Sequence, residues 1–347
     1  MKPKITVLMA IYNGAVYLRE CMESVLHQTY GNFEFLIIDD GSTDSTPDII
    51  RSYKDDRIRL LRNDKNLSQV ASLNIGLDHA KGEYIARIDA DDIMLPHRLE
   101  RQLRFLEKRP DIALLGTCGE AIDEKGRAIS KSKLPVRNEE IIATILFGEF
   151  IMVHSSLMFR KDVIIKAGKY NEAFSFTEDY KLATDLLAKR HKINNMPDSL
   201  IKYRIHDDRI SVRDSRLQIE RYVIALKEFI KNFNSGITEE DSMLLFDFLF
   251  KAGSMNKTYW DKVAEKDMEK AMKLSEQLVA NISNYFKLDK MQNYFMKRIF
   301  YNRILNFAYQ FCGVRKKIGT KLYFHCLKNY FFILGNPKLY ICPLRCF

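Results

Sequence analysis

Three carboxylates follow an apolar segment in the sequence YIARIDADD, namely Asp89, Asp91 and Asp92. If residues 84–88 form a strand, its period of two turns Asp89 and Asp91 to the same side. Like charges at that separation are unfavourable unless a cation lies between them. Hard oxygen ligands favour magnesium, manganese or calcium over zinc. Aspartate is also common in turns and helix N-caps, so a purely structural role stays open.

A second acidic pair, Asp39 and Asp40, ends the upstream apolar run FEFLIIDD. Residues 5–11 and 33–38 have the short, apolar, β-branched composition of buried parallel strands. Residues 17–28 between them carry apolar side chains at helical spacing. This β-α-β unit puts the acidic pair at the carboxyl end of a strand, which is where open α/β sheets bind ligands.

The alternation of strands and helices continues along the chain. We expect strands over 58–61, 84–88 and 112–116, and helices over 70–80 and 96–107. Pro96 suits the first turn of the last helix. The predicted fold class is a doubly wound α/β domain.

Several separated motifs occur in a characteristic order within residues 4–211: VLMAIYNGAVYL, FEFLIIDDGSTDST, NLSQVASLNIG and YIARIDADD. Together they resemble the family-2 glycosyltransferases of the GT-A fold, a Rossmann-like domain with a mostly parallel central sheet. The resemblance implies nucleotide contacts from the backbone near Ala10, from the ring of Tyr12 against uracil, and from Asp40. The Asp40 carboxylate would accept a hydrogen bond from the base.

By the same resemblance, Asp89 contacts the ribose or the metal, and Asp91 binds a divalent ion, manganese or magnesium, that bridges the diphosphate. Such an ion neutralises the charge that grows on departing UDP. Asp92 would instead cap the turn before Pro96. Arg87 either contacts phosphate or only pairs at the sheet edge.

One segment departs from the family pattern. Many members carry a Gly and an Arg near the diphosphate, between the two acidic motifs. This chain has Asn-Leu-Ser at 66–68 and Ser-Leu-Asn at 72–74. The departure puts an Arg–phosphate contact from that helix in doubt, and it leaves Asn74 and Gly76 with a packing role.

Glu178 and Asp179 open a predicted helix in the sequence FSFTEDYKLATDLL. Acidic residues are ordinary in a first helical turn, because the helix dipole favours them. The resemblance implies that this pair supplies the catalytic base, and Asp179 matches the base, with Glu178 as the next candidate. A positioned carboxylate takes the proton of the acceptor hydroxyl as it attacks the anomeric carbon. One base and a metal-bound leaving group imply direct displacement with inversion.

Two histidines are further candidates. His206, in YRIHDDRISVR, resembles a segment that closes over the diphosphate. There it would be a third metal ligand or a phosphate donor, with Arg204 or Arg209 beside it, unless it only belongs to a surface loop. His154, in IMVHSSLMF, matches a position lining the acceptor cavity, or it is a structural histidine.

Basic charge is concentrated in the C-terminal segment. Residues 286–347 hold twelve Lys or Arg and one acid, a net charge of +11, whereas the whole chain carries +10. Basic residues interleaved with aromatics suit an anionic membrane surface, or a helical domain that buries its aromatics. We see no nucleic-acid-binding motif. No run approaches the roughly 18–20 apolar residues of a membrane span, and the early first strand leaves no room for a signal peptide. The scattered cysteines suit a reducing compartment.

Two domains are predicted, a catalytic unit over 1–212 and a mainly helical unit over 213–347. Helices are expected in the second unit over 217–233, 239–250, 262–285 and 288–311.

The predicted activity is transfer of a hexose, glucose or galactose, from a UDP-sugar to a polyprenyl-diphosphate-linked saccharide at the inner face of the plasma membrane. Assembly of O-antigen, lipopolysaccharide or capsule would use such a step. A nucleotidyltransferase is one alternative, but it should show a Gly-rich loop with Arg and Lys where this chain has AIYNGAVYL. A nonenzymatic carbohydrate- or membrane-binding protein is another, and it would not need both Asp91 and Asp179.

Overall fold

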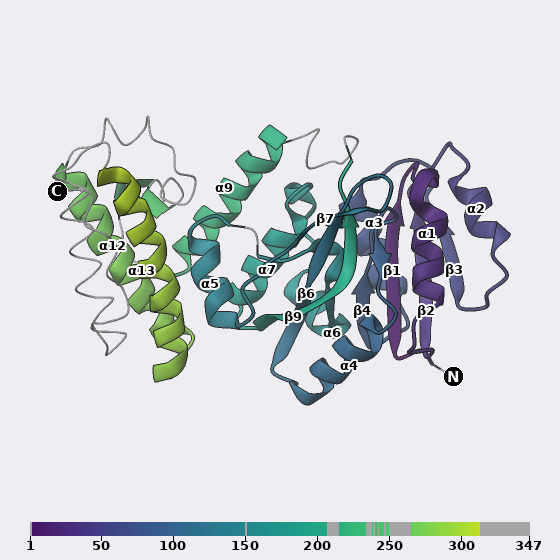
Figure 1. The fold of residues 1–347 in the computed structure, drawn as a ribbon, viewed down its shortest axis with the longest axis horizontal. Helices are drawn as coiled ribbons and strands as arrows, with labels where there is room; N and C mark the ends of the chain where they lie inside the picture. The colour runs from purple at the N-terminus through teal and green to yellow at the C-terminus, as the bar shows by residue number, and fades with distance from the viewer. Residues whose placement is uncertain are drawn as a thin grey trace. The chain divides into compact units, whose positions relative to one another are not determined.

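The computed structural model describes residues 2–149, 151–206, 215–233 and 265–312, with several positions between 238 and 249. The chain divides into two compact units (Figure 1). The first unit comprises Met1–Arg137 and Ile151–Ala225, and the second comprises Asn138–Phe150 and Leu226–Phe347.

A nine-stranded sheet forms the centre of the first unit, in the order β3-β2-β1-β4-β8-β6-β9-β5, with β7 paired to β6. β3, β2, β1 and β4 run parallel, β8 is antiparallel to both of its neighbours, and β6 and β9 are parallel. The predicted α/β class with a mostly parallel sheet is therefore confirmed. The strands are β1 (Ile5–Ile11), β2 (Phe33–Asp39), β3 (Ile58–Arg62), β4 (Tyr84–Arg87), β5 (Ile93–Met94), β6 (Ile112–Ile122), β7 (Ala128–Lys131), β8 (Met158–Arg160) and β9 (Lys192–Arg204).

Helices and single turns connect these strands. They are α1 (Ala15–Leu26), α2 (Thr46–Ser52), α3 (Gln69–His79), α4 (Arg98–Lys108), η1 (His154–Ser156), α6 (Lys161–Ala167), η2 (Glu172–Phe174), α7 (Glu178–Ala188) and α9 (Ser215–Lys231). α4 begins at Arg98, so the expectation that Pro96 lies in its first turn was wrong. The backbone N–H of Arg98 bonds the carbonyl of Leu95, which leaves Pro96 in the turn that leads into the helix.

Strand β1 is buried on both faces, as expected of a central parallel strand. Val7 and Met9 belong to the core that includes Leu18 and Met22 of α1. On the other face, α3 approaches Leu8 so closely that a Cβ on Gly76 would lie 2.3 Å from the Leu8 Cδ1 atom. The packing fixes α3 against the sheet, and α3 begins beside the ends of β2 and β4.

The second unit is helical over the residues that the structure describes. It contains α5 (Asn138–Leu146), α12 (Glu265–Tyr285) and α13 (Lys290–Cys312). α5 packs against α13, with the rings of Phe147 and Phe300 centred 5.6 Å apart. The helical C-terminal region is confirmed, although part of the helix expected over 239–250 and the basic segment after 312 lie outside the described residues.

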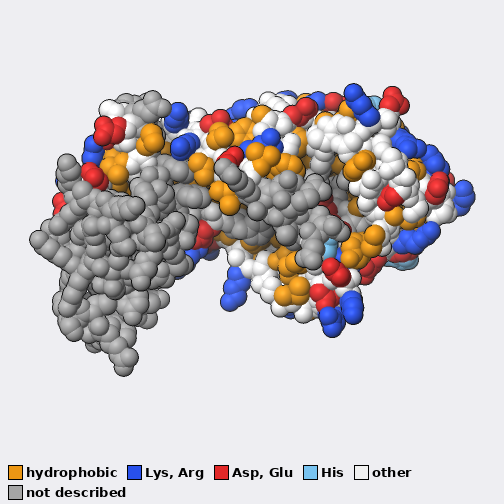
Figure 2. All heavy atoms as spheres, turned by 90° about the horizontal axis from the view of Figure 1, so that it is seen from above, with side chains coloured by type: hydrophobic (Ala, Val, Ile, Leu, Met, Phe, Trp, Pro, Cys, Tyr) orange, Lys and Arg blue, Asp and Glu red, His pale blue; other side chains and the backbone are white. Residues whose placement is uncertain are grey.

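None of the helices in the described part of the chain is both long enough and apolar enough to cross a membrane. On the described surface visible in Figure 2, Lys and Arg side chains are interspersed with Asp and Glu. That mixture agrees with the near-neutral charge of the first 285 residues.

Candidate active site

The three carboxylates that follow β4 converge. One oxygen each from Asp89, Asp91 and Asp92 lies within 4.8 Å of the other two. Burial, followed by the charges of Asp91 and Asp89, raises the pKa of Asp92 well above its ordinary value. Crowded like charges of this kind, all offering hard oxygen donors, fit a divalent cation. Asp92 therefore belongs to the same cluster as the predicted pair, Asp89 and Asp91. The interpretation of Asp92 as a cap, made from the sequence, did not predict this.

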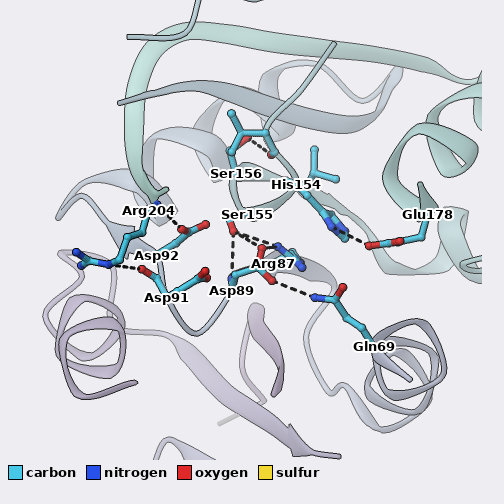
Figure 3. Close-up of polar contacts among 12 residues, drawn as sticks. Gln69, Arg87, Asp89, Asp91, Asp92, His154, Ser155, Ser156, Glu178 and Arg204 are labelled. Carbon is cyan, nitrogen blue, oxygen red and sulfur yellow. Dashed lines mark hydrogen bonds and ion pairs between the residues drawn. The ribbon is translucent and has the colours of Figure 1, made fainter. Parts of the chain in front are cut away.

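Asp89 is held from three directions (Figure 3). Gln69 Nε2 donates to Asp89 Oδ1 at 3.1 Å, Ser155 Oγ donates to Oδ2 at 2.8 Å, and buried Arg87 pairs with the same Oδ2 atom. Burial opposes ionisation of Asp89, but Arg87 and the other partners outweigh it and lower the pKa. The carboxylate is thus ionised and fixed in orientation.

His206 lies beside this cluster, as the sequence predicts. Its Nε2 atom is 3.0 Å from Asp91 Oδ2, and its ring is centred 5.6 Å from the ring of Tyr17. This contact puts a ring nitrogen beside the Asp91 carboxylate, whereas the three ligand atoms that converge are all carboxylate oxygens. Arg209, the basic residue expected nearby, lies outside the described residues.

Arg204 lies beside the acidic cluster, as expected, but its side chain is buried. Its side chain is 1% exposed, its Nε–H donates to the carbonyl of Asp91 at 3.1 Å, and its guanidinium lies 4.3 Å from the Tyr17 ring centre. The remaining contacts include the carbonyls of Asp123 and Glu124. This buried guanidinium is committed to backbone carbonyls and to the Glu20 carboxylate, and it holds the loop of the three carboxylates in place. The expected phosphate contact does not fit these contacts.

Asp40 ends β2 in a buried position and binds the loop after β3. Its carboxylate accepts hydrogen bonds from Asn63 Nδ2 at 2.7 Å and from the backbone N–H groups of Leu67 and Ser68 at 2.9 and 3.0 Å. A carboxylate has about four acceptor positions, so one is left for a ligand. Its neighbour Asp39 is fully buried and pairs with Arg62, which is a structural role.

Tyr12 stands close to Asp40 at the end of β1. The Asp40 N–H donates to the carbonyl of Ile11 at 2.8 Å, and the Tyr12 side chain is 48% exposed. Ala10, the other residue expected near the base, is partly buried on the same strand. A flat exposed ring next to a buried acceptor is suited to a planar base.

The loop between the two acidic strand ends is strained. Ser68 has φ +99° and ψ 154°, a region that side-chain-bearing residues rarely adopt. The two hydrogen bonds to Asp40 hold the backbone there, and Ser68 Oγ caps α3 by accepting from the Ala71 N–H at 3.3 Å. Because Gln69 follows directly and reaches Asp89, this loop links the two acidic strand ends.

The expected catalytic pair opens α7, as predicted. Burial, then the charge of Asp179, raises the pKa of Glu178 to about 7. Burial also raises the pKa of Asp179. Among the causes of these shifts, the charge of Arg87 lowers the pKa of both carboxyls and the charge of Asp89 raises it.

His154 lies on the same side of the site, 3.4 Å from Glu178 Oε1 through its Nδ1 atom. Burial, and then the charge of Arg87, lowers the pKa of His154 well below its ordinary value. The ring is therefore neutral at pH 7. Its neighbours include the Glu178 carboxyl and the hydroxyl of Tyr170.

The chain matches the model of the family described as Glycosyl transferase family 2 over residues 6–168. It is 38% identical over 208 residues to an uncharacterised glycosyltransferase of Methanocaldococcus jannaschii, covering 59% of this chain and 71% of that protein. The chain belongs to glycosyltransferase family 2. This family-2 glycosyltransferase is also 32% identical to the O-antigen biosynthesis glycosyltransferase WbnJ of Escherichia coli, covering 65% of this chain and 89% of that one.

Among solved structures, this family-2 glycosyltransferase resembles S. aureus TarS 1–349 in complex with UDP-GlcNAc. The TM-score is 0.56 at 16% identity, and the match covers 94% of this chain and 91% of that one. At this identity the likeness concerns the fold, and it agrees with the GT-A architecture predicted from the motifs.

Two residues of the glycosyltransferase site were missed by the sequence interpretation. Gln69 and Ser155 both bind Asp89, yet neither belongs to an acidic motif. Ser155 follows His154 in the sequence, so the histidine signal pointed to the correct turn. Gln69 carried no signal of its own. Leu73, in the segment that departs from the family pattern, is fully buried in the core.

Proposed function

We propose that this enzyme transfers a hexosyl group, glucose or galactose, from a UDP-sugar to a hydroxyl of a saccharide acceptor, with inversion at the anomeric carbon. The proposal rests on the turn η1, which contacts both groups of carboxylates. Ser155 donates to Asp89 at 2.8 Å, and the adjacent His154 lies 3.4 Å from Glu178 Oε1. Asp89 pairs with Arg87, and the same Arg87 acts on the pKa of Glu178 and Asp179. A leaving-group site and a base site thereby adjoin.

The donor would lie along the ends of β1, β2 and β4. Tyr12 would stack on the uracil, with the Ala10 backbone beside it, and Asp40 would accept from the base through its remaining acceptor position. Asp89, Asp91 and His206 would hold manganese or magnesium, together with Asp92. Such an ion, when bound, supplies positive charge to the diphosphate. A solved neighbour that is a complex with UDP-GlcNAc supports a UDP-sugar as donor.

Asp179 is the proposed base. The acceptor oxygen attacks the anomeric carbon as the bond from that carbon to the UDP oxygen breaks, and the bonding pair leaves with UDP. The hydroxyl proton passes to the Asp179 carboxylate. Burial of Asp179 assists, because a raised pKa makes the carboxylate a stronger base at neutral pH.

The proposed acceptor is a saccharide on a polyprenyl diphosphate carrier, at the inner face of the plasma membrane. The O-antigen role printed for the similar Escherichia coli protein supports a polysaccharide-assembly step. The basic, aromatic-rich residues 286–347 support peripheral contact with anionic lipid. Capsule synthesis would require the same kind of acceptor.

The deciding experiment incubates the full chain with manganese, a panel of UDP-hexoses, UDP-N-acetylhexosamines and a GDP-hexose, and a short-chain lipid diphosphate saccharide. UDP release, product mass and the anomeric configuration by NMR are measured. We expect transfer from one UDP-hexose with inversion. Retention, or turnover only with the GDP-sugar, would refute the proposal. Release of diphosphate from UTP and a sugar phosphate would instead identify a nucleotidyltransferase.

A further inference from the structure

A row of buried polar side chains leads from α3 to the catalytic pair. His154 stands in its middle, with Nδ1 3.4 Å from Glu178 Oε1 and Nε2 3.3 Å from the Tyr170 hydroxyl. Tyr170 is 2% exposed and Glu178 is 5% exposed. The contacts of His154 on both ring nitrogens leave the imidazole one orientation.

Tyr170 is itself fixed by the backbone. Asn74 Nδ2 donates to the carbonyl of Tyr170 at 2.9 Å, and the Tyr170 N–H donates to Asn74 Oδ1 at 3.0 Å. Asn74 lies on α3, which is packed closely on β1 through Gly76. The packing role predicted for Asn74 thus extends, through Tyr170 and His154, to the position of Glu178.

The turn η1 also connects this row to the acidic cluster. Ser155, the residue after His154, donates to Asp89 Oδ2 at 2.8 Å and accepts from Arg87 at 3.0 Å. One three-residue turn therefore sets the orientation of two carboxyl groups, Asp89 on one side and Glu178 on the other (Figure 3).

The second oxygen of Glu178 is unused. Oε2 is buried and has no hydrogen-bond partner among the described residues. A buried polar atom without a partner is unfavourable, and such atoms are normally satisfied by a water or a ligand. This one belongs to the residue next to Asp179, where the reacting saccharide must lie if Asp179 is the base.

We propose that His154 is a positioning residue that presents Glu178 Oε2 to a hydroxyl group of a saccharide in the site, so that Glu178 selects the sugar. A carboxyl oxygen accepts from such a hydroxyl when ionised and donates to it when protonated. The inference rests on the proposed function and deepens it. The hydroxyl belongs either to the transferred sugar or to the acceptor sugar, and the two sources give different results below.

The test is a double-mutant cycle with Glu178→Ala, His154→Phe and the double variant, beside wild type. His154→Phe keeps ring volume but removes both ring nitrogens. We expect each single variant to lower kcat/KM for transfer by about 10- to 100-fold, the effect of one buried hydrogen bond to substrate. The double variant should fall no further than Glu178→Ala, because His154 acts through Glu178. His27→Phe, at a histidine that is 76% exposed, is the matched control and should equal wild type.

Two binding measurements separate the sources of the hydroxyl. If it belongs to the donor sugar, calorimetry should show weaker UDP-sugar binding with unchanged UDP binding, and discrimination between UDP-glucose and UDP-galactose should decrease. If it belongs to the acceptor, donor binding should hold and the acceptor KM should rise. Either result supports the inference.

Additive losses in the cycle, an equal loss of UDP affinity, or no change in either arm would overturn it. Tyr170→Phe removes only a hydroxyl group, so it tests the same row with less risk of misfolding. We expect it to reduce by about 3-fold the same parameter, donor binding or acceptor KM, that His154→Phe changes. If the wild-type enzyme turns over a UDP-sugar and His154→Phe has the same activity, this inference is refuted but the proposed function is not. A wild-type enzyme that neither binds nor uses any UDP-sugar refutes the proposed function with it.

Discussion

Replacing Ser68 with glycine should stabilise the protein. Ser68 holds φ +99° and ψ 154°, and a side-chain-bearing residue in this region costs of order 1–3 kcal/mol. Glycine removes that strain, since it lacks a Cβ. The substitution also loses the cap on the Ala71 N–H, which costs only a few tenths of a kcal/mol when the replacement is glycine. Greater freedom of the unfolded chain costs roughly 0.5–1 kcal/mol more.

The net expectation for Ser68→Gly is a gain of about 1 kcal/mol in the free energy of unfolding. Urea unfolding measures it, and with a slope of about 1–3 kcal/mol per molar the midpoint should rise by roughly 0.3–1 M. The hydrogen bonds from residues 67 and 68 to Asp40 are backbone bonds, so UDP affinity should not fall.

Ser45→Gly is the matched control. Ser45 also precedes a helix, but its φ is −74° and its side chain makes no capping hydrogen bond. Glycine there relieves nothing and should destabilise by roughly 0.5–1 kcal/mol through the unfolded state. If Ser68→Gly destabilised the protein as much as Ser45→Gly does, the strain assigned to Ser68 would be refuted.

Four further predictions concern the carboxylates and the basic segment. Asp179→Asn should lower turnover by about 10²–10⁴, the range of general-base catalysis, with UDP binding by calorimetry unchanged; near-normal turnover would move the base to Glu178. Chelation of divalent ions, or Asp91→Asn, should weaken UDP binding together with turnover, and full activity in chelator would contradict the metal site. Glu178 has a folded pKa of about 7 against an ordinary 4.5, so its contribution to stability is present below the lower value and is lost as pH rises through the higher one, by about 3 kcal/mol. Glu178→Gln should flatten the decline in urea stability between about pH 4.5 and pH 7, and an unchanged slope would count against the assignment. Removing residues 313–347 should weaken binding to anionic vesicles, and salt should do the same to the whole chain; salt-independent binding would favour a purely structural segment.

The parallel half of the sheet was predictable because the composition of its strands indicates that they are buried. β1 and β2 consist mostly of apolar residues, because both faces of these strands are covered. β9 was not predictable in the same way. It carries Asn194, Asn195 and a proline, and it pairs with β6 through several shifts of register. The Asn195 Nδ2 group donates to the carbonyls of Pro135 and Ile151, which are distant in sequence.

The candidate site likewise contains residues whose positions the sequence predicts and residues whose roles it does not. The motifs around Asp40, Asp91 and Asp179 are local, so their positions at strand and helix ends followed from the sequence. The roles of Arg204 and Glu178 depend on partners far along the chain, which no local pattern encodes. Arg204 is an example. A basic residue beside a phosphate-binding motif suggests a ligand contact, and only the structure shows that its side chain is buried.

The placement of α5 has a consequence for any attempt to divide the protein. Residues 138–150 interrupt the first unit in sequence but belong to the second in space, so no single cut of the polypeptide separates two intact units. α5 carries five fully buried apolar residues, Ile141, Ile142, Ala143, Ile145 and Leu146, and it packs on α13. A fragment that ends before α13 would expose that surface to water and invite aggregation. During synthesis the same surface emerges well before the helix that packs on it, so the second unit can complete its packing only after residues 290–312 have been made.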